Sequence, residues 1–422
     1  MLAGVGYEDG RIVRESEIHE LALLAFGSAE VAGKKILVII PDGTRTAPIG
    51  VIFRAICKEL SGRAAALDYL VALGTHQPMS EEAIRERVGI SPEERRGRYG
   101  KIRFFNHAWD DPAALETVGT IPAAEIRDLT GGLFEMEVRV TANAMLSRYD
   151  LLIIVGPVFP HEVVGFSGGN KYLFPGVAGE EIIGFFHWLG AVVTNPRIIG
   201  NKDTVTRRVV ERCARMVRTP KLCFAMVSSH AGLHGLYIDE PEAAWSAAAD
   251  LSAKLHVVYK GRPYKSVLSC APRMYDDLWT GGKCMYKLEP VVADGGELII
   301  YAPHITEISY THGRVLDRVG YHVRDYFLKR WDEFKGFPWG VLAHSTHVKG
   351  IGAYDGQVER PRVDVVLATG IPEARCRAVN LGYRDPATID PKEWRGNQGR
   401  LLVEQAGETL YRLKNPPSWQ RP

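Results

Sequence analysis

The chain has 422 residues, 46% of them hydrophobic and 24% charged, which is typical of a globular protein of two or three domains and excludes a disordered one. Lysine and arginine number 52 against 50 for aspartate and glutamate, and the resulting net charge of +2 argues against a dedicated nucleic-acid-binding protein. No apolar run reaches the ~20 residues that cross a bilayer, and no signal peptide is evident, so we expect a cytoplasmic protein without membrane contact. The six cysteines form no CxxC pair, and we expect reduced, mostly buried thiols.

Short β-branched runs alternate with helical patterns along the first part of the chain. We expect strands over 35–40, 67–73, 151–155 and 222–227. We expect helices over 49–60, from a cap at Ser80 onward, and over 201–218 and 241–254. Strands that alternate with helices predict a parallel α/β sheet.

The alternation starts again after a polar turn at 260–264. Strands are expected at 266–269, 297–302 and 363–368, with a helical segment over 274–292 that two glycines interrupt. We therefore predict two α/β domains with mainly parallel sheets, over 1–262 and 263–422. We expect a last helix able to pack back on the N-terminal domain, and a frayed tail over 416–422.

Ligand sites of parallel sheets lie at the carboxyl ends of the strands, and two such exits carry unusual residues. Asp42-Gly43-Thr44-Arg45 combines backbone amides at a helix start with hydroxyls and a guanidinium, which suits an anion. An ordinary turn capped by Asp42 explains the same residues. His76, in Gly-Thr-His after the second strand, is placed either as a general base or as a turn cap.

The segment 160–179 holds five glycines together with His161 and Lys171. It matches neither the GxxxxGK[ST] nor the GxGxxG signature of nucleotide-binding proteins. Ser167-Gly168-Gly169 predicts a backbone that a ligand can approach closely. Lys171 is a candidate phosphate contact or covalent anchor, or a solvated lysine, and His187 is a core histidine or a metal ligand.

Together these motifs resemble the nickel-dependent lactate racemase family. The resemblance rests on DGTR, GTH, His161 followed ten residues on by Lys171 in GFSGGNK, the PGVAG stretch, and His187. It covers most of the chain and is densest over 36–190, with a second region at 270–300. Each motif alone is modest, but their order and spacing are specific.

The resemblance implies a nickel pincer nucleotide, Ni(II)-pyridinium-3,5-bisthiocarboxylate mononucleotide, attached covalently to Lys171, and partner enzymes that synthesise it. It implies that His187 binds the nickel and that His76 and His161 are the catalytic acid and base. The implied cofactor contacts are Asp42, Gly43, Thr44, Arg45, Ser167, Gly168 and Gly169. The implied substrate contacts are Arg45, Thr280 and Lys283, so the N-terminal domain would bind the cofactor, the C-terminal domain the substrate, and the site would lie in the cleft between them.

The implied reaction inverts the C2 centre of a 2-hydroxy acid by reversible hydride transfer, which avoids a carbanion. Two histidines are needed because each enantiomer requires its own base. The family has glutamine where this chain has Thr280, which favours a larger or polyhydroxylated acid such as gluconate, with lactate or malate as the alternative. His304, His312, His344 and His347 are expected to be mostly surface or capping residues.

Two other classes of function fit parts of the pattern. A non-catalytic protein that binds a phosphorylated metabolite would use the Gly-rich loop and the DGTR turn, but it would not need His76, His161 and His187. A metal-dependent hydrolase would need several protein ligands on one ion, such as HxxxH or a carboxylate cluster, and no such set stands out in the sequence.

Overall fold

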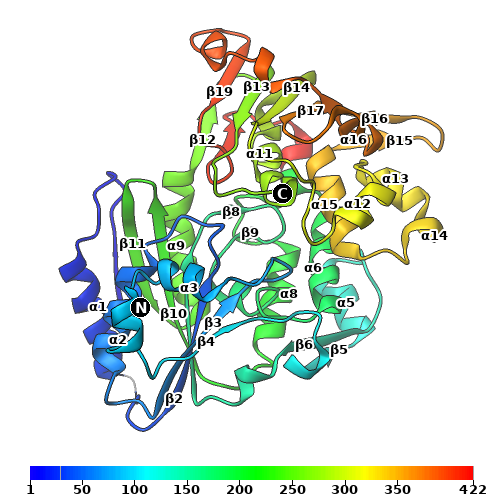
Figure 1. The fold of residues 1–422 in the computed structure, drawn as a ribbon. Coiled ribbons are helices and arrows are strands. Elements are labelled where there is room, and N and C mark those ends of the chain that lie inside the picture. The colour runs from blue at the N-terminus through cyan, green and yellow to red at the C-terminus, as the bar shows by residue number, and fades with distance from the viewer. Residues whose placement is uncertain (29, 422) are drawn as a thin grey trace. The chain divides into compact units, whose positions relative to one another are not determined.

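The structure is a computed structural model that describes residues 1–28 and 30–421 of the chain (Figure 1). Its contacts divide the chain into two compact units, and neither unit is continuous in sequence. Unit 1 comprises Met1–Phe159, Phe166–Ile183 and Arg207–Leu255, and unit 2 comprises Pro160–Gly165, Gly184–Thr206 and the chain from His256 onward. The Gly-rich segment after residue 160 is therefore divided between the two units.

Unit 1 is built on a seven-stranded sheet in the order β1-β11-β10-β7-β2-β3-β4. In that order the strands are Ala3–Gly6, Gly232–Asp239, Lys221–Ser229, Leu151–Pro157, Lys35–Pro41, Ala66–Ala72 and Phe104–Asn106. The pairs from β10 to β4 are parallel, whereas β1 and β11 add an antiparallel edge. The central strands confirm the parallel sheet that the alternating pattern predicts.

Besides this sheet, unit 1 contains helices and an antiparallel pair of strands. The helices wholly or mainly in unit 1 are α1 (Glu15–Ser28), α2 (Ile49–Leu60), α3 (Glu81–Arg87), α4 (Pro92–Arg96), α5 (Ala123–Thr130), α8 (Val205–Ala214) and α9 (Pro241–His256). Strands β5 (Leu115–Ile121) and β6 (Val138–Asn143) form an antiparallel pair. Ser80 caps α3 as predicted, since its hydroxyl oxygen accepts a hydrogen bond from the Ala83 N–H at 3.1 Å.

Strand β2 shows why the sequence forms a sheet covered on both faces. Ile36, Val38 and Ile40 belong to a core shared with α1 and α2. Leu37 and Ile39 alternate with them and so point to the opposite face, where they are also fully buried. A strand buried on both faces has a continuous apolar run, which is the KILVII pattern of this chain.

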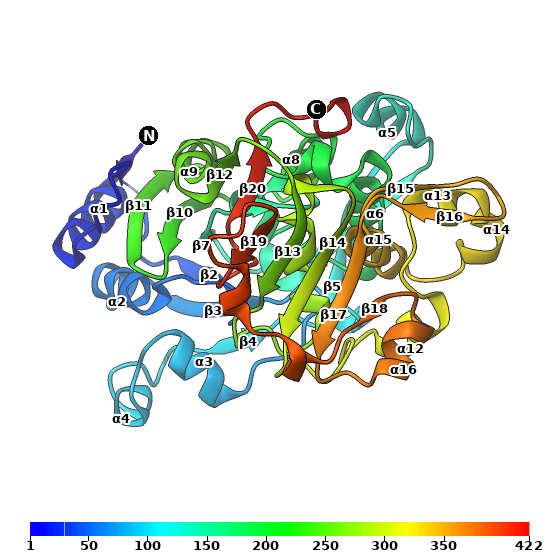
Figure 2. The ribbon, with the colours of Figure 1, turned by 90° about the horizontal axis from the view of Figure 1, so that it is seen from above.

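Unit 2 has a five-stranded parallel sheet in the order β18-β17-β14-β13-β19 (Figure 2). In that order the strands are Gly382–Tyr383, Asp364–Thr369, Val292–Ala302, Tyr264–Cys270 and Arg400–Val403. Val267 and Leu298 face one hydrophobic core, and Leu268 and Ile299 face another that includes Trp394. Two strand pairs, β12 (Val257–Lys260) with β20 (Leu410–Leu413) and β15 (Gly352–Tyr354) with β16 (Glu359–Pro361), also belong to this unit.

The helices of unit 2 are mostly short. They are α7 (Asn195–Ile198), α10 (Leu278–Gly281), α11 (Lys283–Tyr286), α12 (Gly313–Val319), α13 (Arg324–Lys329), α14 (Trp331–Phe334), α15 (Trp339–Lys349) and α16 (Glu373–Ala378). Helix α6 (Glu180–Val193) begins in unit 1 and continues into unit 2. Within residues 1–28 and 30–421, none of the helices has the length and apolar character that crossing a bilayer requires.

The segment Gly184–Thr206 belongs to unit 2 although it precedes the boundary that the sequence predicts at residue 262. Trp188 stacks on Trp331, with ring centroids 5.4 Å apart and planes at 10°. Arg324 donates a hydrogen bond to the carbonyl oxygen of Val192 at 2.9 Å. These contacts join residues far apart in sequence, so a boundary placed from local patterns leaves the segment in the first domain.

The end of the chain differs from the expected last helix and frayed tail. Among the described residues after α16 there is no further α-helix, only the strands β18, β19 and β20 and the 3-10 turns η5 (Pro386–Thr388), η6 (Pro391–Trp394) and η7 (Ser418–Gln420). The Gln420 amide is buried and donates to the Pro290 carbonyl at 2.8 Å. The Arg362 guanidinium carbon lies 4.2 Å from the ring centroid of Trp419. These two side chains anchor the end of the chain to unit 2.

Candidate active site

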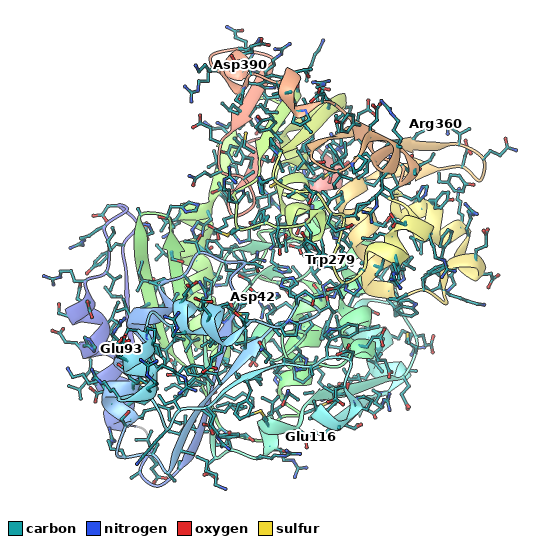
Figure 3. The ribbon with its side chains drawn as sticks, viewed as in Figure 1. Asp42, Glu93, Glu116, Trp279, Arg360 and Asp390 are labelled. Atoms are coloured by element: carbon teal, nitrogen blue, oxygen red, sulfur yellow. The ribbon has the colours of Figure 1, made fainter. Side chains whose placement is uncertain are left out.

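The turn that follows β2 holds Asp42, which is buried and labelled in Figure 3. Its Oδ1 accepts hydrogen bonds from the backbone N–H and the hydroxyl of Thr44, at 3.1 and 2.8 Å. Arg87 donates to the carbonyl oxygen of Arg45 at 3.1 Å, and the Ser228 hydroxyl donates to that of Thr46 at 2.8 Å. The conformation of this turn is therefore supported from inside unit 1, by two residues that the sequence analysis did not identify.

Asp42 also pairs with His76. Strands β2 and β3 are parallel neighbours with Pro41 opposite Ala72, so the residues after them emerge side by side. His76 Nδ1 lies 2.5 Å from Asp42 Oδ2. Because a carboxylate only accepts, this contact places a proton on Nδ1 and makes Nε2 the basic nitrogen of His76. The sequence predicted both residues but not their pairing.

Lys171 lies near the same end of the sheet, where the parallel strands finish. It belongs to the 3-10 turn η3 (Gly169–Tyr172), which contacts β7 and β2. Its neighbour Tyr172 is buried, and a side chain at Gly156 in β7 would collide with the Tyr172 ring. Burial raises the pKa of Tyr172, and the positive charges of nearby Arg45 and Arg87 oppose that rise. Asp42, Arg45, His76 and Lys171 are therefore grouped at the carboxyl ends of adjacent parallel strands, as the fold class predicts.

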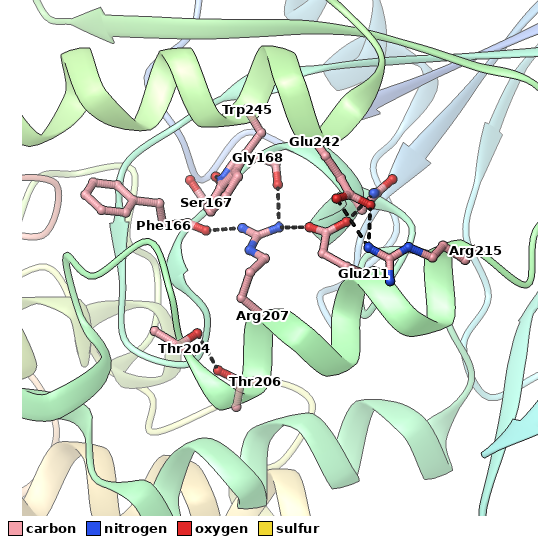
Figure 4. Close-up of polar contacts among 11 residues, drawn as sticks. Phe166, Ser167, Gly168, Thr204, Thr206, Arg207, Glu211, Arg215, Glu242 and Trp245 are labelled. Carbon is pink, nitrogen blue, oxygen red and sulfur yellow. Dashed lines mark hydrogen bonds and ion pairs between the residues drawn. The ribbon is translucent and has the colours of Figure 1, made fainter. Parts of the chain in front are cut away.

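The buried side chain of Arg207 holds the loop before Lys171 through hydrogen bonds to its backbone (Figure 4). Arg207 in α8 donates to the carbonyl oxygens of Phe166 and Gly168 and pairs with Glu211 at 3.2 Å. Its guanidinium carbon lies 4.0 Å from the ring centroid of Trp245. Burial raises the pKa of Glu211, whereas the charge of Arg207 opposes that rise. This network fixes the loop, and the sequence analysis did not identify it.

The predicted cofactor contacts in this loop have packing roles. Gly168 and Gly169 have φ of 85° and 58°, which favours glycine. An added Cβ would lie 2.5 Å from a methyl carbon of Val158 at the first and 2.8 Å from Trp245 at the second. The Ser167 hydroxyl donates to the Pro157 carbonyl at 3.0 Å and accepts from a backbone N–H. These glycines are explained by protein contacts without a ligand.

His107, which the sequence analysis did not single out, clamps the PGVAG stretch. Its Nε2 donates to the Ala178 carbonyl at 2.8 Å, and its Nδ1 accepts from the Asn143 amide at 3.2 Å. Burial lowers the pKa of His107 to about 4, so the ring is neutral near pH 7. The Gly74 N–H adds a bond of 2.9 Å to the Gly176 carbonyl, which ties this stretch to the loop that carries His76.

In unit 2, His161 is buried and has the opposite proton arrangement to His76. Its Nδ1 accepts a hydrogen bond from the Val163 N–H at 3.1 Å. A backbone N–H can only donate, so the neutral ring carries its proton on Nε2. Glu162 Oε2 lies 3.4 Å from the same Nδ1. The directed backbone bond decides the tautomer, and the more distant carboxylate stabilises positive charge on the ring.

His187 is half-buried on α6, in the part of the helix that belongs to unit 2. His187 is one of four neighbours whose charges lower the pKa of buried His344. The other three are His347, His312 and Lys283. Burial is the main reason that the pKa of His344 lies well below its usual value. Within the described residues no three His, Cys, Asp or Glu side chains are grouped so as to hold a metal ion.

Lys283 and Thr280 are both buried in the short helices α10 and α11. Lys283 Nζ lies 4.6 Å from the ring centroid of Tyr275. The Thr280 hydroxyl donates to Asp277, at 3.1 Å to the carbonyl and 3.0 Å to the carboxylate. Asp277 caps α10, so Thr280 takes part in starting the helix. Its predicted role in substrate binding stays a prediction.

The expectation that the unit 2 histidines are mostly surface or capping residues is wrong for two of them. His344 and His347 are 8% and 5% exposed. Trp279, labelled in Figure 3, lies between two imidazoles, with ring centroids 4.4 Å from His312 and 4.2 Å from His344. These residues come from α10, α15 and the turn before α12, so only the fold reveals the cluster.

Comparison with known proteins shows that this chain is similar to lactate racemases over part of its length. Residues 25–198 match the family model of the lactate racemase N-terminal domain. A lactate racemase of Thermoanaerobacterium thermosaccharolyticum is 27% identical over 152 residues, and one of Lactiplantibacillus plantarum is 26% identical over 232 residues. The alignments cover 36% and 53% of this chain, and only 31% and 49% of those relatives.

Two solved structures extend the comparison to nearly the whole chain. A protein of Thermotoga maritima is 34% identical with a TM-score of 0.89, covering 97% of this chain and 100% of that one. The lactate racemase apoprotein of T. thermosaccharolyticum has a TM-score of 0.69 at 17% identity, covering 94% and 93%, and shares the predicted α/β fold. The matched range includes DGTR, His76, His161, Lys171 and His187. Residues 25–198 of this chain are thus a lactate racemase N-terminal domain.

Proposed function

We propose that this protein is an isomerase that inverts the C2 stereocentre of a 2-hydroxy acid, as a racemase or an epimerase. The observation that carries the proposal is the His76–Asp42 pair, 2.5 Å long, at the same sheet edge as Lys171. A base oriented by a carboxylate beside an amine anchor is what alcohol oxidation on a tethered cofactor requires. The family relationship supports the same reaction class.

The residues of the chain fit a nickel pincer nucleotide attached to Lys171. Lys171 would supply the amine for the covalent bond, and the Arg45 guanidinium with the Gly43 N–H would hold the anionic part of the nucleotide. His187 would supply one imidazole ligand, with the remaining ligands belonging to the cofactor itself. When bound, this group supplies an acceptor for the hydride of the alcohol carbon. Enzymes that synthesise the cofactor are the partners that this scheme requires.

The two histidines would serve opposite steps of the proton transfer. His76 carries its proton on Nδ1, so Nε2 accepts the hydroxyl proton as the alcohol is oxidised. To donate a proton from Nε2 to the oxygen of the returning alcohol, His161 would start as the imidazolium, which Glu162, 3.4 Å from Nδ1, would stabilise, and it would end as a neutral ring. With the other enantiomer the transfers would run in reverse, from protonated His76 to neutral His161.

For the substrate we propose a larger or polyhydroxylated acid, such as a sugar acid of the gluconate type. Arg45 and Lys283 would hold the carboxylate. The Thr280 hydroxyl is bonded to Asp277, so it replaces the family glutamine with a shorter group whose donor is engaged. Imidazoles of His312 and His344 lie near Trp279 and offer polar contacts to additional hydroxyls. Lactate or malate with the same mechanism is the second candidate.

A panel of 2-hydroxy acids tests the proposal. The protein is produced together with the cofactor-synthesis enzymes, dialysed, and incubated in D₂O with lactate, malate and gluconate. We expect nickel that survives dialysis, a mass addition on Lys171, and inverted product that keeps protium at C2. Deuterium at C2 would contradict hydride transfer, because a deprotonating racemase exchanges that hydrogen with solvent.

The same preparation separates the other classes of function. A non-catalytic protein that binds a phosphorylated metabolite would carry neither nickel nor an adduct on Lys171. A metal-dependent hydrolase would lose its metal to a chelator and would also lack the adduct. Either result would contradict the proposed isomerase.

A further inference from the structure

A cavity of about 300 Å³ lies within unit 2, and none of the residues used in the proposed function lines it. Its wall includes the end of α6, helix α7, the end of α15 and the turn η7. The lining side chains that matter here are Thr194, Asn195, Arg197, Arg324, His347 and Trp419. This volume lies at the lower end of the range of small-molecule sites.

Two residues that line the cavity each have a buried polar atom without a hydrogen-bond partner. Asn195 is 3% exposed, and its Nδ2 donates to the Tyr286 carbonyl at 3.0 Å. The Oδ1 of the same amide accepts no hydrogen bond, and Nε2 of His347 is likewise unpartnered. A buried polar atom without a partner destabilises the folded protein, and a ligand that pairs with it relieves that cost. Because Asn195 Oδ1 can only accept, a molecule that satisfies it must bring a donor such as a hydroxyl.

The charged side chains around the cavity leave an excess positive charge. Arg324 pairs with Asp325 at 2.9 Å, and Glu289 lies 3.8 Å from Arg362, so these charges compensate one another. Arg197 is exposed at the wall, and no carboxylate within residues 1–28 and 30–421 pairs with it. A guanidinium binds a carboxylate through two parallel hydrogen bonds. The cavity therefore combines an anion contact with an acceptor for a hydroxyl.

The backbone at the wall has a feature of its own. Thr194 has φ of 86°, a conformation that β-branched residues rarely adopt and that folded proteins retain mainly at ligand sites. We propose that this cavity binds a small hydroxylated carboxylate, separately from the site at Lys171. Its carboxylate contacts Arg197, one hydroxyl donates to Asn195 Oδ1, and a further polar group meets His347 Nε2.

Calorimetric titration of the full-length chain tests this assignment with sodium gluconate as the probe. The titration uses the Lys283→Ala variant, which lacks one of the two cations proposed to hold the carboxylate in the active site, so that gluconate binding there is weakened. We expect one equivalent of gluconate to bind. Acetate and glycerol, each with half of the recognised chemistry, should bind at least tenfold more weakly.

Variants in the Lys283→Ala background locate the binding. Arg197→Ala and His347→Phe should each weaken gluconate binding about tenfold, which corresponds to about 1.4 kcal/mol. Arg148→Ala, which removes an exposed arginine of unit 1, is the matched control and should change nothing. Melting curves check that the His347→Phe variant folds. If it does not, the Arg197→Ala variant decides the test alone, because it changes an exposed residue.

Two results would overturn the assignment. The first is absence of gluconate binding to the Lys283→Ala variant. The second is binding that neither Arg197→Ala nor His347→Phe weakens. Neither result depends on nickel or on an adduct at Lys171, so failure of the proposed isomerase would be seen separately.

Discussion

The candidate side chains of unit 1 and unit 2 are held in place by different means. In unit 1, Asp42, His76 and Lys171 follow parallel strands, and short directional bonds such as the 2.5 Å His76–Asp42 contact orient them. In unit 2, Lys283 and His344 come from separate helices and are buried among aromatic rings. Strand exits can be recognised in a sequence, whereas helix faces that meet only in the fold cannot.

The largest expected effect tests the unit 1 side of this comparison. Replacing Lys171 with alanine removes the only amine proposed for covalent attachment. We expect complete loss of the mass adduct and of C2 inversion, while the protein remains folded because Lys171 is half-exposed. Intact-protein mass spectrometry and chiral chromatography measure the two losses. Lys58→Ala, on the exposed side of α2, is the control and should retain both.

The His76–Asp42 pair predicts the next largest effect. In Asp42→Asn the amide can present a donor to His76 Nδ1, which moves the ring proton to Nε2 and removes the base. We expect kcat/KM to fall by about 10²–10⁴ while the Lys171 adduct is kept. The exposed Asp110→Asn serves as control.

The tautomers themselves can be measured without any cofactor. Imidazole ¹⁵N chemical shifts of the apoprotein should place the proton of His76 on Nδ1 and that of neutral His161 on Nε2. In Asp42→Asn only the His76 spectrum should change. Equal tautomers for the two histidines would contradict their opposite roles.

The fold was predictable where burial follows local periodicity. The run KILVII became β2, which buries a continuous stretch, and the pattern over 49–60 became α2, which buries residues at helical spacing. The helix expected over 274–292 is instead divided into α10, α11 and the 3-10 turn η4 (Glu289–Val291). A Cβ at Gly282 would lie 2.8 Å from a Val348 methyl, so close packing on α15 explains this glycine. That constraint comes from residues more than 60 positions away, and local patterns do not contain it.

The site was predictable residue by residue but not as an arrangement. His76 and Asp42 both end parallel strands, and the adjacency of those strands was the signal that would have paired them. The glycines of the loop were interpreted as room for a ligand, whereas Gly169 makes room for Trp245. Arg207 is one of several arginines in an amphipathic helix, and the sequence pattern does not distinguish it as buried. A buried arginine and an exposed one have the same sequence signature.

Arg207 therefore provides a comparison within one helix. Arg207→Met leaves the buried Glu211 carboxylate without its charged partner, and we expect a loss of about 3–5 kcal/mol in the free energy of unfolding. Arg212→Met breaks the half-exposed pair with Glu125 and should cost at most about 1 kcal/mol. Urea denaturation measures both. Adding Glu211→Leu to Arg207→Met should recover part of the loss, and equal costs for the two arginines would contradict the burial argument.

The smallest effect compares one buried histidine from each unit. Burial lowers the pKa of both His107 and His347 to about 4, below the value of about 6.5 for an unfolded histidine. Above pH 6.5 both rings are neutral in either state, so the full stability is present. As the pH falls from 6.5 towards 4, each histidine takes up its proton in the unfolded chain before it does so in the folded protein. Each should therefore lower the free energy of unfolding by about 3 kcal/mol over this range.

Two variants separate the histidines by what else they do. His107→Gln keeps a donor for the Ala178 carbonyl, and His347→Phe removes a ring whose Nε2 has no hydrogen-bond partner. Each should therefore flatten the pH dependence of the unfolding free energy between pH 7 and pH 4. Only His107→Gln should also lower stability at pH 7, because it disturbs the bond from Asn143. If either variant kept the wild-type slope of unfolding free energy against pH, burial would not be what keeps that imidazole neutral. The contrast between directional hydrogen bonds in unit 1 and burial in unit 2 would then not extend to these two histidines.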